Sequence, residues 1–228
     1  MASPGIFIVG HSLGAAEASL YAYSRVKRGL PVDGVYVFGC PRPGNSALGS
    51  ALASVPIWRS IRNACGGFPD YDLVTVVPFD IEPVLDYAQP APFETIAEPP
   101  APDDPWLLFR YHHSQLYQAG CRKLVATGSG TAVELVEAID AVQDLYDGTG
   151  VWSWTHFVDG EYCAIRTNAA GARMLVFRGS TTELDWMHDL DTMQVELHGA
   201  KVSRGFWAGV GPQEAELDAA LAADTERG

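Results

Sequence analysis

A serine flanked by glycines is the residue of this sequence best suited to covalent chemistry. Gly10-His11-Ser12-Leu13-Gly14 follows the apolar run 5–9 and precedes a small-residue, helix-like stretch over 15–28. A G-x-S-x-G turn between a strand and a helix is typical of a serine whose hydroxyl is exposed as a nucleophile. Glycines flank such a turn because a Cβ there would clash with neighbouring backbone. A capping serine is the alternative, but it does not explain glycine on both sides.

A serine hydroxyl needs a base to take its proton and a carboxylate to orient that base. We expect His11, inside the turn, to point elsewhere. The remaining histidines are candidates for the base: His112, His113, His156, His188 and His198. The adjacent pair His112 and His113 follows a proline-rich segment, 77–105, which predicts a long surface loop. A histidine beyond such a loop suits a base that reaches over a sheet edge.

The elements that would position these residues alternate between strand and helix. In the first part of the chain, strands are predicted at 5–9, 34–39 and 57–61, and helices at 15–28 and 47–53. Because this alternation is typical of a parallel sheet, we expect a mainly parallel sheet covered on both faces. Further along, we predict a helix at 131–146, strands at 161–167, 173–177 and 193–197, and a closing helix at 206–223 that Pro212 starts or breaks.

Composition bounds the class of protein. The 228 residues predict a single domain over 1–228, and 47% apolar with 19% charged residues is typical of a compact globular fold. The net charge of −13 argues against nucleic acid as a partner. We find no apolar run long enough for a transmembrane segment, and no signal peptide, and so we expect a cytoplasmic protein. The four cysteines lack metal-binding spacing, and we expect no metal.

Four segments resemble the class 3 lipases, the fungal-lipase-type branch of the α/β-hydrolases. They are 6–15 with the serine turn, 37–45 with Pro-Arg-Pro-Gly-Asn, 72–78 with Asp-x-Val and a later proline, and 175–181 with Arg-Gly-Ser. The resemblance implies an α/β-hydrolase fold with a mainly parallel central sheet flanked by helices. It also implies a serine carboxylester hydrolase, a lipase or esterase, that works through a Ser-His-Asp triad and an acyl-enzyme.

The resemblance assigns roles to particular residues. Ser12 is the nucleophile, and Asp72 is the acid in preference to Asp70 or Asp80. Family members carry the base shortly before an aromatic residue, which favours His113, ahead of Tyr117, and leaves His112 as the alternative base.

The resemblance also places the oxyanion hole and the lid. The backbone N–H groups of Leu13 and Ser180 would form the oxyanion hole; Ser180 is also suited to cap a helix. Residues 181–190 occupy the place of the family's lid. There Trp186 and Met187 would either cover the acyl site or pack in the core.

The two halves of the chain match the two halves of the family's sequence in exchanged order. Residues 1–120 match the family's C-terminal half, and 130–228 match its N-terminal half. We therefore expect a circular permutation, in which Met1 and Gly228 end near each other in space.

The resemblance implies no cofactor and a small acyl ester or lipid as substrate, with at most transient contact with a lipid interface. Phospholipase A1-type cleavage and acyl transfer use the same triad and remain alternatives. A non-catalytic binding module on the same scaffold is a third hypothesis, because fold does not imply function.

Overall fold

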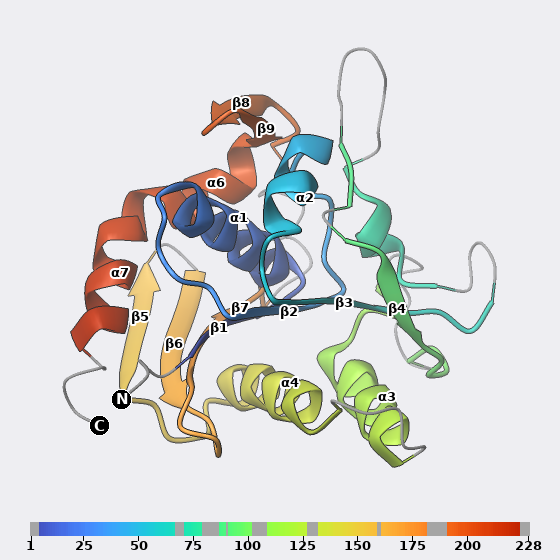
Figure 1. Ribbon diagram of the computed structural model, residues 1–228. Helices are drawn as coiled ribbons and strands as arrows, with labels where there is room; N and C mark the ends of the chain where they lie inside the picture. The colour runs from blue at the N-terminus through green and yellow to red at the C-terminus, as the bar shows by residue number, and fades with distance from the viewer. Residues whose placement is uncertain are drawn as a thin grey trace.

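A seven-stranded sheet forms the centre of the computed structural model, which describes residues 5–66, 71–78, 87–89, 91–101, 109–126, 132–158, 161–181 and 191–223. The strands are β1 (Ile6–His11), β2 (Gly34–Phe38), β3 (Ile57–Asn63), β4 (Phe93–Ile96), β5 (Trp154–Val158), β6 (Glu161–Thr167) and β7 (Arg173–Arg178). Their order is β4-β3-β2-β1-β7-β6-β5 (Figure 1). The neighbours in the run β4-β3-β2-β1-β7 pair in parallel, whereas β6 pairs antiparallel with β7 and β5 pairs antiparallel with β6.

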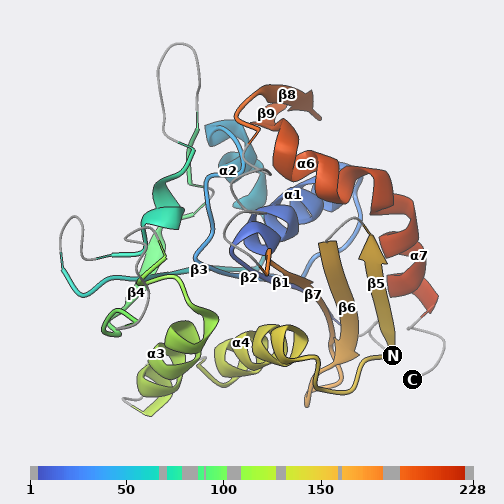
Figure 2. The ribbon, with the colours of Figure 1, turned by 180° about the vertical axis from the view of Figure 1, so that it is seen from behind.

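Helices cover both faces of the sheet, as Figures 1 and 2 show from opposite sides. One face carries α1 (Leu13–Lys27), α2 (Ser46–Leu52) and α6 (Arg204–Val210), and the other carries α3 (Ser114–Ala126) and α4 (Ala132–Asp147). The remaining elements are α7 (Glu214–Ala223), the short 3-10 helices η1 (Leu73–Val76) and η2 (Gly211–Gln213), and the hairpin of β8 (Gln194–Leu197) and β9 (Ala200–Ser203). The mainly parallel sheet flanked by helices, an α/β-hydrolase architecture, is confirmed.

Alternate residues of the central strands supply the two halves of the core. Ile8 of β1 packs in the apolar cluster under α1, whereas the next residue, Val9, packs in the cluster under α3 and α4. Val35 and Tyr36 of β2 divide in the same way. Successive side chains of a strand point to opposite faces, so both faces are apolar and a continuous hydrophobic strand needs helices on each side.

One prediction at the level of elements was wrong in part, and the break that was one of two alternatives for Pro212 is present. The segment 77–105, predicted as loop, contains β4, which pairs with β3 in parallel. Its four residues include the charged Glu94 and the exposed Thr95, and so carry too little apolar pattern to stand out among the prolines. The closing helix is interrupted: α6 and α7 are separated by η2 at Pro212, because proline has no N–H to continue the helical ladder.

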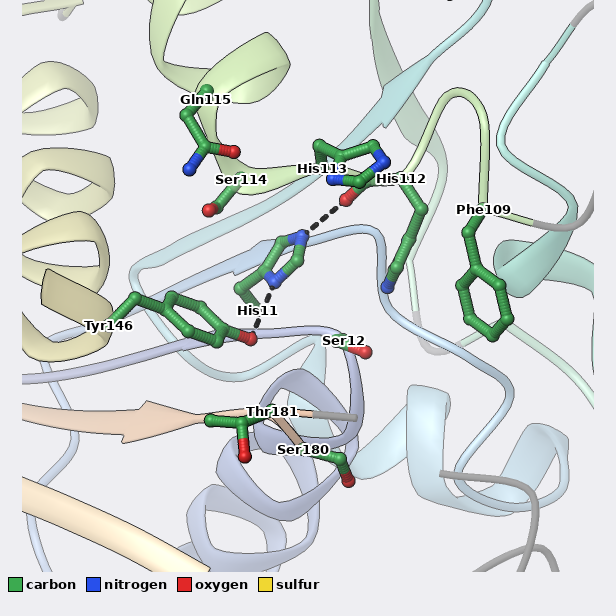
Figure 3. Close-up of a pocket in the computed structure, with 10 residues that line it drawn as sticks. All are labelled: His11, Ser12, Phe109, His112, His113, Ser114, Gln115, Tyr146, Ser180 and Thr181. Carbon is green, nitrogen blue, oxygen red and sulfur yellow. Dashed lines mark hydrogen bonds between the residues drawn. The ribbon is translucent and has the colours of Figure 1, made fainter. Parts of the chain in front are cut away.

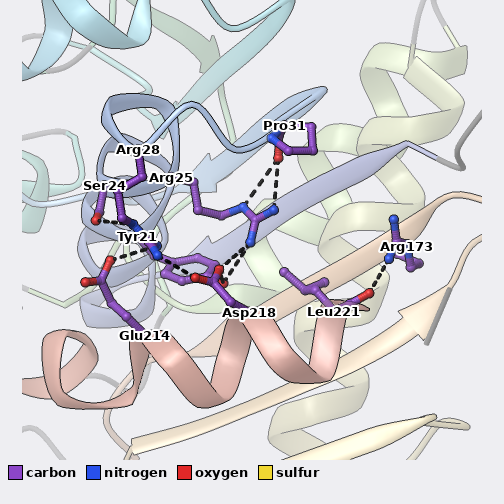
Figure 4. Close-up of polar contacts among 9 residues, drawn as sticks. All are labelled: Tyr21, Ser24, Arg25, Arg28, Pro31, Arg173, Glu214, Asp218 and Leu221. Atoms are coloured by element: carbon purple, nitrogen blue, oxygen red, sulfur yellow. Dashed lines mark hydrogen bonds and ion pairs between the residues drawn. The ribbon is translucent and has the colours of Figure 1, made fainter. Parts of the chain in front are cut away.

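The two ends of the described chain meet at one residue, Arg173. The backbone N–H of Arg173 donates to the carbonyl of Gly5 (2.9 Å), and its guanidinium donates to the carbonyl of Leu221 (Figure 4). This proximity agrees with what a circular permutation requires. Met1 and Gly228 themselves lie outside the described residues, and the permutation stays a prediction.

A cluster of charges fastens α7 to α1 (Figure 4). The Asp218 carboxylate accepts hydrogen bonds from Arg25 (2.5 Å), Arg28 (2.5 Å) and the hydroxyl of Tyr21 (2.7 Å). Arg25 is only 4% exposed, so its charge depends on this carboxylate and on the carbonyl of Pro31 for compensation. A buried charge without a partner is strongly destabilising.

We expect Asp218→Ala to lower the free energy of unfolding by about 2–3 kcal/mol, somewhat below the cost of breaking a fully buried pair, since Asp218 is partly exposed. Glu214→Ala is the matched control on the same helix. Glu214 pairs only with the more exposed Arg28, and its loss should cost less than about 1 kcal/mol. Urea unfolding of the two variants measures the difference, and equal losses would show that Arg25 does not depend on Asp218.

Candidate active site

Ser12 is the single residue between the end of β1 and the start of α1. Its backbone has φ 60° and ψ −132°, a conformation that costs a non-glycine residue about 1–3 kcal/mol. The Ser12 N–H donates to the carbonyl of Phe38 on β2 (3.0 Å), which helps to hold the strained turn in place. The strand, tight turn and helix predicted around this serine are all present.

The glycines of the turn are explained by close backbone approaches. A Cβ on Gly10 would overlap the carbonyl of Gly14, and a Cβ on Gly14 would lie 2.6 Å from the carbonyl oxygen of Phe177. A third glycine, Gly179, follows β7, and its Cβ would lie 2.7 Å from the Cβ of Ser12. The backbone of the Arg-Gly-Ser turn therefore packs directly against the serine.

Asp72 is completely buried, at 0% exposure, where β3 has ended and η1 begins. Its carboxylate accepts hydrogen bonds from the N–H of Val74 (3.0 Å), from Nδ1 of His112 (2.7 Å) and from the hydroxyl of Tyr117. Burial and the neighbouring Asp72 raise the pKa of Tyr117 well above its usual value, so the phenol stays a donor. Three donors compensate a carboxylate that water does not reach.

The histidine bonded to Asp72 is His112, and not His113. With Nδ1–H donated to Asp72, Nε2 of His112 is left as an acceptor, and it is buried without a hydrogen-bond partner among the described residues. Figure 3 shows the ring of His112 pointing toward Ser12, whereas the ring of His113 does not. His113 is instead the residue before α3, and its carbonyl accepts the N–H of Leu116 (2.9 Å). The structure therefore places His112, the alternative base, and not the preferred His113, against Asp72.

A cavity of about 250 Å³ opens at Ser12 (Figure 3). Its lining comes from four parts of the chain: His11, Ser12, Phe109, His112, His113, Ser114, Gln115, Tyr146, Ser180 and Thr181. Ser180 and Thr181 lie across Ser12 from the two adjacent histidines. Leu13 is the first residue of α1, where a backbone N–H has no acceptor within the helix.

His11 lies where the sequence did not predict it, and Tyr146 and Gly39 had no predicted role. His11 does not point elsewhere: its ring stacks on that of His112, with centroids 4.7 Å apart. Tyr146, at the end of α4, bonds to His11 (3.0 Å). Gly39 has φ +58°, and a Cβ there would lie 2.8 Å from Oδ2 of Asp72 and from Cε1 of His112. Gly39 is the last residue of the second predicted strand, and a glycine at that position was the available signal.

The remaining candidates lie elsewhere. Trp186, Met187 and His188 are outside the described residues, and so are Asp70 and Asp80. His156 stacks on Trp154 of β5, and His198 lies in the β8–β9 turn; neither lines the cavity. Among the described residues, no group of three or more His, Cys, Asp or Glu side chains could hold a metal ion.

Comparison with known proteins bears on the first third of the chain. A family model described as Lipase (class 3) matches residues 2–80, a range that includes Ser12 and Asp72 and ends before His112 and Ser180. No curated protein and no solved structure matches the chain. In the described part of the chain, no helix is long and apolar enough to cross a membrane.

The family match supports a hydrolase of the lipase or esterase type that acts on an ester or lipid substrate. Residues 2–80, which carry the serine turn and the buried aspartate, thus match the class 3 lipase family, and the sheet with its flanking helices has the α/β-hydrolase architecture.

Proposed function

We propose that this protein is a serine carboxylester hydrolase in which Ser12 is the nucleophile, His112 the base and Asp72 the orienting acid. The observation that carries the proposal is the state of His112. Its Nδ1 is fixed by a buried carboxylate, and its Nε2, buried without a partner among the described residues, faces the cavity at Ser12. This is the arrangement that a base needs in order to take a proton from a serine hydroxyl.

The chemistry follows from these positions. Ser12 Oγ attacks the carbonyl carbon of the ester, and its proton passes to His112 Nε2. Asp72 stabilises the imidazolium that forms. The C–O bond to the alcohol then breaks, and His112 returns the proton to the departing alkoxide. Water, activated by the same histidine, hydrolyses the acyl-enzyme and restores the Ser12 hydroxyl.

The oxyanion that forms during attack needs backbone donors close to Ser12. The N–H of Leu13 is one proposed donor, and the N–H of Ser180 is the second. The support for Ser180 is the close packing of Gly179 on Ser12, which brings the start of that turn against the nucleophile. The positive end of α1, directly behind Ser12, also favours negative charge at this place.

The size of the cavity favours a short acyl group. At about 250 Å³ it lies below the usual range of sites for drug-sized ligands, about 300–1,000 Å³. Its lining also includes the polar side chains of Ser114, Gln115 and Thr181, beside the proposed catalytic residues. p-Nitrophenyl acetate and butyrate are therefore the first substrates to assay.

We expect Ser12→Ala to lower kcat on p-nitrophenyl butyrate by at least about a thousandfold, because the covalent intermediate can no longer form. The wild type should react with a fluorophosphonate probe at Ser12, located by mass spectrometry of the labelled peptide, and the variant should not. A wild-type protein that neither turns over the ester nor takes the label would overturn the proposed function.

The two adjacent histidines form a matched pair of variants. His112→Ala should lower kcat by about a thousandfold or more, since the proton of Ser12 loses its acceptor. His113→Ala should retain kcat within about tenfold, because its ring is not directed at Ser12. Steady-state kinetics of both variants decides between them, and the reverse ranking would restore His113 as the base.

Gly39→Ala tests whether the acid–base pair needs the space that this glycine leaves. Its methyl group would displace both Asp72 and His112, so we expect kcat to fall at least about a hundredfold. Gly29→Ala is the control: its φ is also positive, at +73°, but nothing lies within 4 Å of the added Cβ. Both variants carry a similar backbone strain of about 1–2 kcal/mol. Equal activities would show that the crowding at Gly39 is relieved without moving the pair.

A further inference from the structure

A chain of hydrogen bonds joins the two sides of the cavity behind Ser12. The N–H of Gly179 lies 3.1 Å from the phenol oxygen of Tyr146, this oxygen lies 3.0 Å from Nδ1 of His11, and Nε2 of His11 lies 2.8 Å from the carbonyl oxygen of His112. Figure 3 draws the last two contacts. The chain begins on the turn that carries Ser180 and ends on the turn that carries His112.

When His11 is neutral, only one arrangement of protons satisfies every contact in this chain. The carbonyl of His112 can only accept, so Nε2 of His11 must carry a hydrogen. A neutral imidazole then has Nδ1 as an acceptor. Tyr146 therefore donates its O–H to Nδ1 of His11 and accepts the N–H of Gly179 with a lone pair. Burial, together with the neighbouring His112, lowers the pKa of His11 well below its usual value, which keeps this ring neutral.

The neutral state of His11 matters for its stacked neighbour. The two rings lie 4.7 Å apart at 27°, and His112 becomes positively charged when it takes the serine proton. A second positive charge at that distance would oppose the proton transfer. The neutral ring of His11, fixed by Tyr146, adds no positive charge beside His112. The positive charge that forms on His112 is then stabilised by Asp72 without opposition from His11.

We propose that His11 and Tyr146 are positioning residues that hold the oxyanion turn at Gly179 and the base at His112 in fixed relation across Ser12. This inference rests on the proposed ester hydrolysis. It assigns no bond-making step to either residue. The two turns come from distant parts of the chain, and errors of about 1 Å in such positions reduce catalysis by about a hundredfold.

Tyr146→Phe is the direct test. The variant removes the hydroxyl from both contacts and keeps the ring, which packs edge-on against His11. We expect kcat on p-nitrophenyl butyrate to fall about 10- to 100-fold with KM changed less than about threefold, because ground-state binding is not affected. The rate of labelling by the fluorophosphonate probe should fall in parallel.

Tyr162→Phe is the matched control. Both tyrosine rings lie against the guanidinium of Arg178, at 6.0 Å for Tyr146 and 5.1 Å for Tyr162, but Tyr162 is outside the cavity and the chain of bonds. Its kcat should equal that of the wild type. A Tyr146→Phe variant with the kcat of this control would overturn the inference, as would a change confined to KM.

A second pair of variants tests His11 by partial rescue. His11→Ala should lower kcat about as far as Tyr146→Phe, and His11→Gln, whose amide keeps an N–H near the carbonyl of His112, should recover part of the loss. Because the residues act as one unit, the double variant Tyr146→Phe/His11→Ala should be little worse than either single variant. Fully additive effects would contradict the inference.

One measurement does not depend on activity or on a variant that folds. Long-range ¹⁵N NMR of the wild-type protein distinguishes the tautomers of its histidines. The inference requires the Nε2–H tautomer for His11, opposite to the Nδ1–H tautomer expected for His112. An Nδ1–H tautomer at His11 would overturn it. An inactive wild type would overturn the proposed hydrolysis instead, so the two failures are distinguishable.

Discussion

The site is organised around a carboxylate that has no contact with water. Asp72 is fully buried, and an isolated charge in such a place would be far too costly without hydrogen bonds. The three donors that compensate it come from three directions: η1, the turn at His112, and Tyr117 of α3. Satisfying the carboxylate therefore fixes α3 and the histidine turn against the ends of β2 and β3. The orientation of His112, the proposed base, follows from this requirement of burial.

The serine reaches its position by a different constraint. Ser12 occupies a strained backbone conformation between β1 and α1, and such strain persists only where the surroundings hold it. Here β1 is the central strand of the sheet, paired along its length with β2 and β7. On the side of β7, the backbone packs closely against the turn: Gly14 approaches Phe177, and Gly179 approaches Ser12. Rigid packing on both sides lets the strained residue keep one geometry.

The sequence predicted those features that depend on contiguous residues, and it did not predict those that depend on contacts between distant parts of the chain. The serine turn, the strands and the helices beside it are written in contiguous residues, and the structure contains them. Asp72 was predicted only through the resemblance to a known family, since one loop aspartate looks like another. The resemblance favoured His113 over His112, but the residues alone could not decide between them, because adjacent residues in a turn differ only in side-chain direction. That direction is set by the stacking on His11 and by the bond to Asp72, contacts across 101 and 40 residues of chain.

The same reasoning explains why His11 was misplaced. A residue inside the serine turn carries no sign of its partners, because Tyr146 and His112 are 135 and 101 residues away. Its neighbours in sequence place it on β1, with its side chain on the face opposite to α1, and there it meets α4 and the histidine turn. Once this position is known, the need to satisfy each buried polar group leaves a single pattern of donors and acceptors from Gly179 to His112. His11, next to the proposed nucleophile, thus contacts both the turn of the proposed base, at His112, and Tyr146, which bonds to the turn at Gly179, so one buried ring links the two turns.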